Sequence, residues 1–253
     1  MLKARVLSAA VLLPVVIISI ILGGWYFPLF IVVTSFLACA EYVQMLKLKS
    51  YTLGLPAVLA LCAVWQANAV WSDGEWFVPA FAAIVALITF WELIQRHMHP
   101  EKIDPSVQWA LILAGGLYIG IGSSFLIRLR ALNDGLWWTL TALPIIWVSE
   151  SGAYFIGKRY GNHKMSPSIS PGKSWEGYVA QVTSGILTGG IVGWLLPIVT
   201  GNSIGLNIWT GMGMGVLLSA LSTVGDFFVS MIKREVGVKD SGSLIPGHGG
   251  VFD

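Results

Sequence analysis

Apolar residues fill eight long stretches of the chain, and short polar segments separate them. Each stretch is about as long as an α-helix must be to cross the roughly 30 Å hydrocarbon core of a bilayer. The pattern predicts membrane-spanning helices near residues 6–22, 25–43, 53–71, 76–94, 106–127, 136–156, 178–199 and 204–229. The predicted fold class is therefore all-α, a polytopic integral membrane protein with about eight transmembrane helices.

The chain shows no internal repeat and no Pro/Gly/Ser-rich linker, so we expect a single membrane domain over residues 1–253. Within it we distinguish an N-terminal helical half, 1–135, from a catalytic half, 136–253. The catalytic half carries a polar cytoplasmic loop at 157–177 and a polar segment at 225–253. The glycines at 189–193 and 211–215 lie inside apolar stretches, where close helix–helix approach is their expected role.

Composition supports this interpretation, because 55% of the 253 residues are hydrophobic and only 11% are charged. A soluble domain usually carries about a quarter charged residues. The net charge of +2 and the absence of a long basic run argue against a nucleic-acid partner. Cys39 and Cys62 both fall in apolar runs, so we interpret them as small core residues and not as a disulfide or metal pair. The first apolar run is longer than the core of a usual signal peptide, which favours an uncleaved anchor.

The basic residues predict the orientation. With a cytoplasmic N-terminus and eight crossings, thirteen of the fifteen lysines and arginines lie inside, and only Arg128 and Arg130 lie outside. This is the asymmetry of the positive-inside rule. Both termini of this chain are then cytoplasmic, in a bacterial inner (plasma) membrane. The segment 128–135 is where a miscounted helix is most expected.

Four acidic residues lie within or beside the apolar stretches, where a charge is costly: Glu41, Glu92, Glu150 and Asp226. Glu41 and Glu92 lie near the cytoplasmic ends of their helices, can reach the interface, and are expected to be structural.

Asp226 and Glu150 each head a polar stripe at helical spacing. Asp226 shares a helix face with Ser219, Ser222, Ser230 and Lys233, and Glu150 is followed at i+4 and i+8 by Tyr154 and Lys158. Two such helices can line one polar cavity that opens to the cytoplasm. Packing serines explain the hydroxyls but not the carboxylates, so a functional role is favoured for both acids.

The polar segments contain the side chains that phosphate chemistry requires. The run from Gly157 to Gly177 mixes lysine, arginine, hydroxyl and turn residues, which suit phosphate oxygens. Gly172-Lys173-Ser174 resembles the end of a P-loop, but no glycine lies five residues earlier and no strand is predicted before it, so we reject a Walker site. Acids and bases alternate after Asp226, as suits a metal–nucleotide complex, and the glycine-rich run 246–250 lets backbone amides approach an anion.

One spacing in this region resembles a known family. Ser230-x-x-Lys233-Arg234-x4-Lys239-Asp240-x-Gly242-x3-Pro246-Gly247-His248-Gly249-Gly250-x-x-Asp253 is similar to the signature of the phosphatidate cytidylyltransferases, also called CDP-diacylglycerol synthases. The runs at 152–157 and 170–177 resemble the same family. The resemblance implies transfer of a cytidylyl group from CTP to phosphatidic acid, giving CDP-diacylglycerol and pyrophosphate for phospholipid biosynthesis.

The resemblance also implies roles for individual residues. A divalent cation, Mg²⁺ or a similar ion, is expected at Asp226 and Asp253, with Glu150 as a weaker candidate. The expected catalytic residues are Asp226, Lys233, Lys239, Asp240 and His248. Binding of CTP and phosphatidic acid is expected to involve Lys173, Ser174, Ser230, Arg234, Gly247, Gly249 and Gly250. The membrane lipid is the other partner, and a homodimer is one expected arrangement.

Two departures from the family pattern stand out. The family usually has Asp where this chain has Glu150, which is one methylene longer. The family signature also continues past Asp253 with arginine, another aspartate and a further membrane helix. On this ground the chain is expected to be C-terminally truncated and to have little activity in this form.

Two alternatives stay open at this point. A CTP-dependent lipid-alcohol kinase would transfer the γ-phosphate and release CDP. A small membrane transporter also fits intramembrane acids and glycine-broken helices, although it would need polar residues at mid-membrane depth on several helices.

The orientation predicts a labelling pattern. A membrane-impermeant thiol reagent added from outside should modify a cysteine placed at Ser72 but not one placed at Ser168. The reverse pattern would overturn the whole topology.

Overall fold

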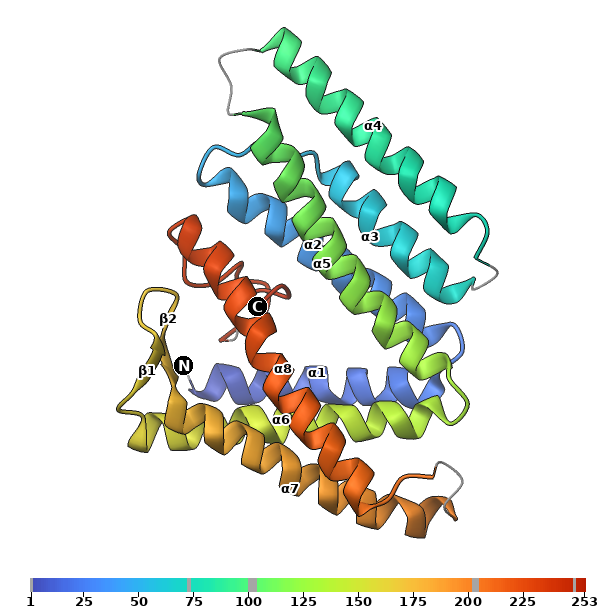
Figure 1. Ribbon diagram of the computed structural model, residues 1–253, viewed down its shortest axis with the longest axis vertical. Coiled ribbons are helices and arrows are strands. Elements are labelled where there is room, and N and C mark those ends of the chain that lie inside the picture. Colours follow the sequence, from blue (N-terminus) through green and yellow to red (C-terminus); the bar gives the residue numbers. More distant parts are fainter. Residues whose placement is uncertain (1, 72–73, 100–103, 202–204, 248) are drawn as a thin grey trace. The chain divides into compact units, whose positions relative to one another are not determined.

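The computed structural model describes residues 2–71, 74–99, 104–201, 205–247 and 249–253. These residues form eight α-helices and one two-stranded hairpin (Figure 1). In chain order the elements are α1 (Leu2–Leu22), α2 (Tyr26–Lys47), α3 (Leu55–Val70), α4 (Phe77–Met98), α5 (Pro105–Ala131), α6 (Gly135–Tyr160), β1 (Lys164–Ser166), β2 (Ser170–Ser174), α7 (Trp175–Thr200) and α8 (Ile208–Glu235).

Every predicted membrane span overlaps one of these helices, so the all-α fold class is confirmed. Among the described residues, five helices are long and apolar enough to cross a bilayer: α2, α4, α5, α7 and α8. α3 is shorter, at 16 residues. The large side chains exposed along these helices are mostly apolar, as lipid contact requires. The protein is therefore an integral membrane protein.

The chain divides into two compact units, which we describe separately. The first contains Met1–Ala131 together with Val236–Asp253, and the second contains Leu132–Glu235. The C-terminal segment thus groups with the helices of the N-terminal half.

The first unit packs α3 against α5, with α2 beside both. Glycines on α5 allow this approach, since a methyl group at Gly120 would lie 2.9 Å from the Cα atom of Cys62. Tyr42 is fully buried against the same helix, and its hydroxyl donates to the carbonyl of Leu111 at 2.8 Å. Cys39 and Cys62 are free and buried, which confirms their interpretation as core residues.

Arg128 and Arg130, the two exceptions to the predicted charge asymmetry, bind helix ends. Both lie in the last turn of α5. Arg130 Nε donates to the carbonyl of Ile20 in the last turn of α1 at 2.7 Å, and Arg128 donates to the carbonyl of Asn68 near the end of α3 at 3.4 Å. The C-terminal carbonyls of a helix lack internal partners and carry partial negative charge, so a cation there is favourable. These contacts give both arginines a structural role, which explains why they do not follow the predicted asymmetry of basic residues.

The second unit is held together where α7 crosses α8 (Figure 1). Small residues recur at every fourth position of both helices: Gly185, Gly189 and Gly193 on α7, and Gly211, Gly215 and Ser219 on α8. A methyl group at Gly189 would overlap the carbonyl oxygen of Gly211, and one at Gly215 would overlap that of Gly185. The two backbones are therefore in direct contact, as small-xxx-small interfaces in membranes require. This confirms the expected role for Gly189, Gly193, Gly211 and Gly215, whereas Gly213 faces open space.

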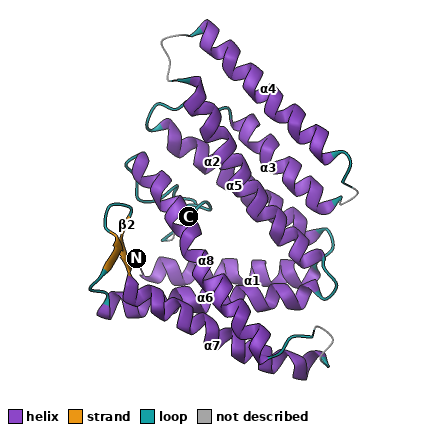
Figure 2. Cartoon of the chain, viewed as in Figure 1, coloured by secondary structure: helices purple, strands orange, loops and turns teal. Residues whose placement is uncertain are grey.

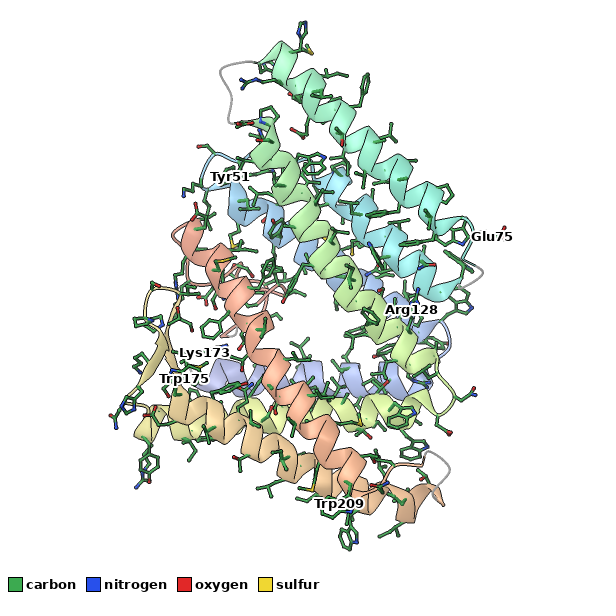
Figure 3. All side chains as sticks on the ribbon, in the orientation of Figure 1. Tyr51, Glu75, Arg128, Lys173, Trp175 and Trp209 are labelled. Atoms are coloured by element: carbon green, nitrogen blue, oxygen red, sulfur yellow. The ribbon has the colours of Figure 1, made fainter. Side chains whose placement is uncertain are left out.

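Exposed tryptophans mark both ends of this unit. Trp175 begins α7 beside Lys173, and Trp209 lies at the start of α8, at the other end of the helix pair (Figure 3). Trp209 is 79% exposed and Trp175 is 53% exposed. Tryptophans at both ends of a helix pair are typical of membrane–water interfaces.

The predicted loop at 157–177 is more ordered than the sequence suggested. α6 continues to Tyr160 and α7 begins at Trp175, and between them β1 and β2 form an antiparallel hairpin with Lys164 opposite Ser174 (Figure 2). The prediction that no strand precedes Lys173 is therefore wrong, since β2 leads directly into α7. The P-loop interpretation stays rejected on its missing glycine.

The backbone contact between α7 and α8 predicts opposite effects at two glycines. Gly213 has open space where its side chain would be, so Gly213→Ala should be neutral or stabilise by up to about 1 kcal/mol through helix propensity. Gly189→Ala makes the same propensity gain but forces two backbones apart, and should lower the free energy of unfolding by about 1–3 kcal/mol. Thermal or denaturant unfolding in the same detergent compares the two. Equal free energies of unfolding for the two variants would contradict the direct backbone contact between α7 and α8.

Candidate functional site

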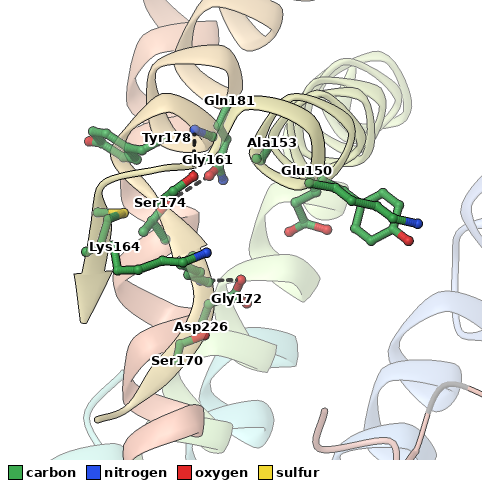
Figure 4. Close-up of a pocket in the computed structure, with 17 residues that line it drawn as sticks. Glu150, Ala153, Gly161, Lys164, Ser170, Gly172, Ser174, Tyr178, Gln181 and Asp226 are labelled. Atoms are coloured by element: carbon green, nitrogen blue, oxygen red, sulfur yellow. Dashed lines mark hydrogen bonds and ion pairs between the residues drawn. The ribbon is translucent and has the colours of Figure 1, made fainter. Parts of the chain in front are cut away.

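A cavity of about 590 Å³ lies in the second unit, among α6, the hairpin, α7 and α8 (Figure 4). Its volume falls in the range of sites for small molecules and cofactors. The lining residues are Glu150, Ala153, Tyr154, Gly157, Lys158, Gly161, Lys164, Met165, Ser170, Gly172, Lys173, Ser174, Gly177, Tyr178, Gln181, Thr223 and Asp226. The two polar stripes expected from the sequence, on α6 and α8, thus reach one cavity.

Charged side chains of both signs meet in this cavity. Lys173 Nζ lies 2.7 Å from Asp226 Oδ2, and it also lies 4.7 Å from the centre of the Phe227 ring. Half of the Asp226 side chain is exposed, so this carboxylate remains accessible from the cavity. Glu150 is the second acid in the lining, and Lys158 and Lys164 are further cations. The lining therefore offers three ammonium groups around two carboxylates.

The inner wall of the cavity is a hydrogen-bonded link between α7 and α8. Gln181 Nε2 donates to Ser222 Oγ at 2.8 Å, and Gln181 Oε1 accepts from Thr223 Oγ1 at 2.9 Å. Both ends of this buried amide are thus used, which offsets the cost of placing it in an apolar protein interior. Ser219, one turn closer to the N-terminus of α8, is fully buried against Gly185. The polar face of α8 is therefore turned toward α7 and not toward lipid.

The N-terminus of α7 also faces the cavity. Ser174 is its N-cap, and the Ser174 hydroxyl accepts a hydrogen bond from the backbone N–H of Gly177 at 3.2 Å. Both residues line the cavity together with Tyr178. The amides of a helix N-terminus and the helix dipole favour an anion, so this end of α7 adds positive potential to that of the lysines.

The hairpin that carries Lys173 is fixed at both of its ends. The backbone N–H of Trp175 donates to the carbonyl of His163 at 2.9 Å, and the carboxylate of Glu176 lies 2.6 Å from His163 Nδ1. The backbone N–H of His163 also donates to the Glu176 carboxylate at 3.1 Å. At the turn, Arg234 Nε donates to the carbonyl of Ile169 at 3.1 Å.

A second polar cluster lies in the first unit, within the C-terminal segment. Asp253 Oδ2 accepts from the Ser241 backbone N–H at 2.8 Å, from the Ser241 hydroxyl at 2.9 Å and from the Gly250 backbone N–H at 2.8 Å. Ile245 and Gly249 exchange two backbone hydrogen bonds across the turn between them. Gly247 and Gly249 have φ angles of +82° and +107°, which side chains rarely adopt. The segment is therefore closed into a loop by the Asp253 carboxylate.

The predicted site residues fall into three groups. Glu150, Lys173, Ser174 and Asp226 line the cavity. Ser230, Lys233 and Arg234 lie in the last two turns of α8. Lys239, Asp240, Gly247, Gly249, Gly250 and Asp253 lie in the C-terminal segment, whereas His248 lies outside the described residues. Two assignments gain a structural detail, because Ser174 caps α7 and Arg234 binds the hairpin backbone.

Glu41 makes structural contacts, as expected, but its surroundings differ from the prediction. The sequence suggested that it reaches the interface, but the residue is only 8% exposed and its carboxylate binds the C-terminal segment. Glu92 is likewise buried, at 6% exposure. Gln181 was missed altogether, although a lone glutamine on a glycine-rich apolar helix is a signal that could have found it.

The residues that line the cavity fit a magnesium ion bound by two carboxylates, but not one enclosed by protein ligands alone. Within the described part of the chain, no three His, Cys, Asp or Glu side chains come close enough to form a metal cage. Mg²⁺ commonly binds one or two carboxylates and completes its shell with water and substrate phosphates. Asp226 and Glu150, two carboxylates on one cavity, match that mode.

The fold and the site together define a polytopic membrane protein with a mixed-charge cavity built from helix ends and a hairpin. More specifically, the chain belongs to the cytidylyltransferase family, whose model matches residues 3–253. The family resemblance of the signature residues is thereby confirmed.

Curated relatives match along nearly the whole chain, and those described here carry the name phosphatidate cytidylyltransferase. One from Staphylococcus haemolyticus is 30% identical over 252 residues, which cover 99% of this chain and 92% of the relative. One from Synechocystis sp. is 32% identical, with 98% and 90% covered. A third, from Staphylococcus aureus (strain COL), is 30% identical, with 99% and 92% covered.

Proposed function

We propose that this protein transfers the cytidylyl group of CTP to phosphatidic acid, giving CDP-diacylglycerol and pyrophosphate. The observation that carries the proposal is one cavity lined by lysines, a helix N-terminus and two carboxylates, in a protein that exposes many large apolar side chains. Membership of the cytidylyltransferase family and the name of its relatives support the choice of CTP and phosphatidic acid.

The reaction needs alignment more than acid–base chemistry. A phosphatidate oxygen attacks the α-phosphorus of CTP, a new P–O bond forms, and the bond to the leaving pyrophosphate breaks. The attacking phosphate is already anionic near neutral pH, so no strong general base is required. The main task of the protein is to neutralise and orient two polyanions.

The chain's own cations suit that task. Lys173 is held in the cavity by Asp226 and the Phe227 ring, and there its ammonium can meet phosphate oxygens beside the N-terminus of α7. Lys233, Arg234 and Lys239 are proposed to bind further oxygens of CTP or phosphatidate, with Ser174 and Ser230 as hydroxyl partners. Asp240 is proposed to act with these cations. His248 is proposed to orient the glycines at 247, 249 and 250 and not to act as a base.

A divalent cation is part of the proposal. Asp226 and Glu150 would hold it, and Asp253 is a further predicted ligand. When bound, such an ion neutralises charge on the triphosphate. We also propose that both termini are cytoplasmic and that the membrane is the bacterial inner membrane, so that CTP arrives from the cytoplasm while the lipid enters from the bilayer. A homodimer remains a further prediction.

The reaction is tested with membranes that contain the protein, labelled CTP, phosphatidate and Mg²⁺. We expect CDP-diacylglycerol and pyrophosphate, and we expect chelation of the divalent ion to abolish both. The assay is repeated with the chain extended by the arginine, aspartate and final helix of the family pattern. Release of CDP in place of pyrophosphate would indicate a lipid kinase, and no product from either form would contradict the proposed reaction.

Asp226→Asn should lower the rate of CDP-diacylglycerol formation on the order of a hundredfold or more. The amide keeps the size of the side chain but loses the charge that holds a metal ion and Lys173. Asp134→Asn is a matched control, because it makes the same chemical change in the same unit but outside the cavity lining. Near-normal turnover of the Asp226 variant would show that this carboxylate is a packed polar group without a role in the reaction.

A further inference from the structure

Glu41 lies inside a membrane-spanning helix yet makes its hydrogen bonds to the opposite end of the chain. It is six residues before the end of α2, or about 9 Å along the helix axis. Its Oε2 atom accepts from the backbone N–H of Phe252 at 2.9 Å, and it shares the single hydroxyl proton of Ser241, at 3.3 Å, with Asp253 Oδ2, at 2.9 Å. The carboxylate therefore ties two points of the C-terminal segment to α2.

The segment is shaped around this carboxylate. A methyl group at Gly242 would lie 2.8 Å from Glu41 Oε1, and one at Gly250 would overlap Glu41 Oε2. Glycine at these two positions lets the backbone close over the acid. Close contact of the segment with both oxygens of the carboxylate indicates a specific binding site for Glu41 and not a chance contact.

The neighbouring residues add an apolar half to the same contact. The ring of Phe252 packs edge-on against Tyr42 at 5.5 Å between centroids and against Tyr118 at 6.5 Å. Phe252 is 8% exposed and Tyr42 is fully buried. Adjacent residues of α2 thus bind adjacent features of Phe252, its backbone N–H and its ring.

The contact continues from Glu41 to Asp253 through one side chain. The Ser241 hydroxyl lies between Glu41 Oε2 and Asp253 Oδ2, and Asp253 in turn accepts from the backbone of Ser241 and Gly250. Removing Glu41 would free Phe252 and loosen the turn that holds the 247–250 glycines. Glu41 Oε1 has no hydrogen-bond partner among the described residues, so a single acceptor oxygen serves the whole contact.

From this geometry we infer that Glu41 is a positioning residue: it holds the C-terminal signature segment, 239–253, in its working conformation. The inference deepens the proposed function, since that segment contains residues proposed to bind CTP and phosphatidate. Glu41 acts through Ser241 and Phe252 and touches no substrate itself.

Three variants separate this role from general stability. Glu41→Ala removes the acceptor, Glu41→Gln keeps one acceptor oxygen at the same reach, and Glu92→Ala removes a buried acid of the same unit that makes no contact with the segment. Hydrogen exchange of the amides in 241–253 is measured in detergent or lipid nanodiscs, and the kcat/KM for CTP is measured in parallel.

We expect Glu41→Ala to speed exchange in 241–253 by about tenfold or more, while exchange in α3 and α5 is unchanged. The same variant should lower kcat/KM for CTP by about tenfold or more, because a small misplacement of substrate-binding groups is costly. Glu41→Gln should restore both to within about twofold of the parent, and Glu92→Ala should leave both near the parent. Unchanged exchange in Glu41→Ala, or equal loss in the Gln and Ala variants, would overturn the inference.

A variant in the C-terminal segment tests the same contact without any substitution in α2, and so serves as a control for misfolding of that helix. Gly242→Ala places a methyl group against Glu41 Oε1 without altering the helix, and should also speed exchange in 241–253. Unchanged exchange in this variant would contradict the close contact between Glu41 and the segment. The exchange result is independent of catalysis. A parent protein that makes no CDP-diacylglycerol would therefore refute the proposed function and leave the role of Glu41 to be decided by exchange.

Discussion

Direct backbone contact between α7 and α8 is the constraint on which the second unit depends. Small residues at every fourth position remove the side chains that would keep the helices apart. In lipid, where apolar side chains gain little by leaving their solvent, such close packing is a main source of helix association. The same spacing continues to Gln181 and Thr223, whose hydrogen bond replaces backbone contact at the cavity wall. The interface between α7 and α8, which holds the unit together, therefore also reaches the cavity wall.

Several polar side chains inside the apolar units are bound by the protein itself. Gln66 donates to Ser123 at 2.8 Å and to Ser35, and Arg130 donates to the end of α1. Lys173 and Asp226 neutralise one another beside the cavity. Unbound polar groups in hydrocarbon are costly, so these pairings are conditions of folding as much as features of a site. Among the charges of the cavity, Lys158 lies in the last turn of α6 and Lys173 lies on the hairpin, whereas Glu150 and Asp226 lie inside their helices.

Much of the fold could be predicted, because length and hydrophobicity alone define a membrane helix. The stripe at Ser219, Ser222 and Asp226 also predicted correctly that one face of α8 turns toward protein. The hairpin was not predicted, since strands of three and five residues with proline and glycine give no alternating pattern. The roles of Arg130 and Glu41 were out of reach for a different reason: their partners are backbone groups 110 and 211 positions away, and a backbone group leaves no signature in sequence.

The contact between Glu41 and the C-terminal segment has a consequence for the order in which the parts of the protein can assemble. Phe252 is translated 211 residues after Glu41, when the ribosome has already synthesised the eight helices of the described residues. Until then α2 carries a buried acid whose hydrogen-bond donors do not yet exist. Completion of the first unit is thus a late event in biogenesis. A nascent chain stalled before residue 241 would present an unsatisfied intramembrane acid, which is a feature that membrane quality control could recognise.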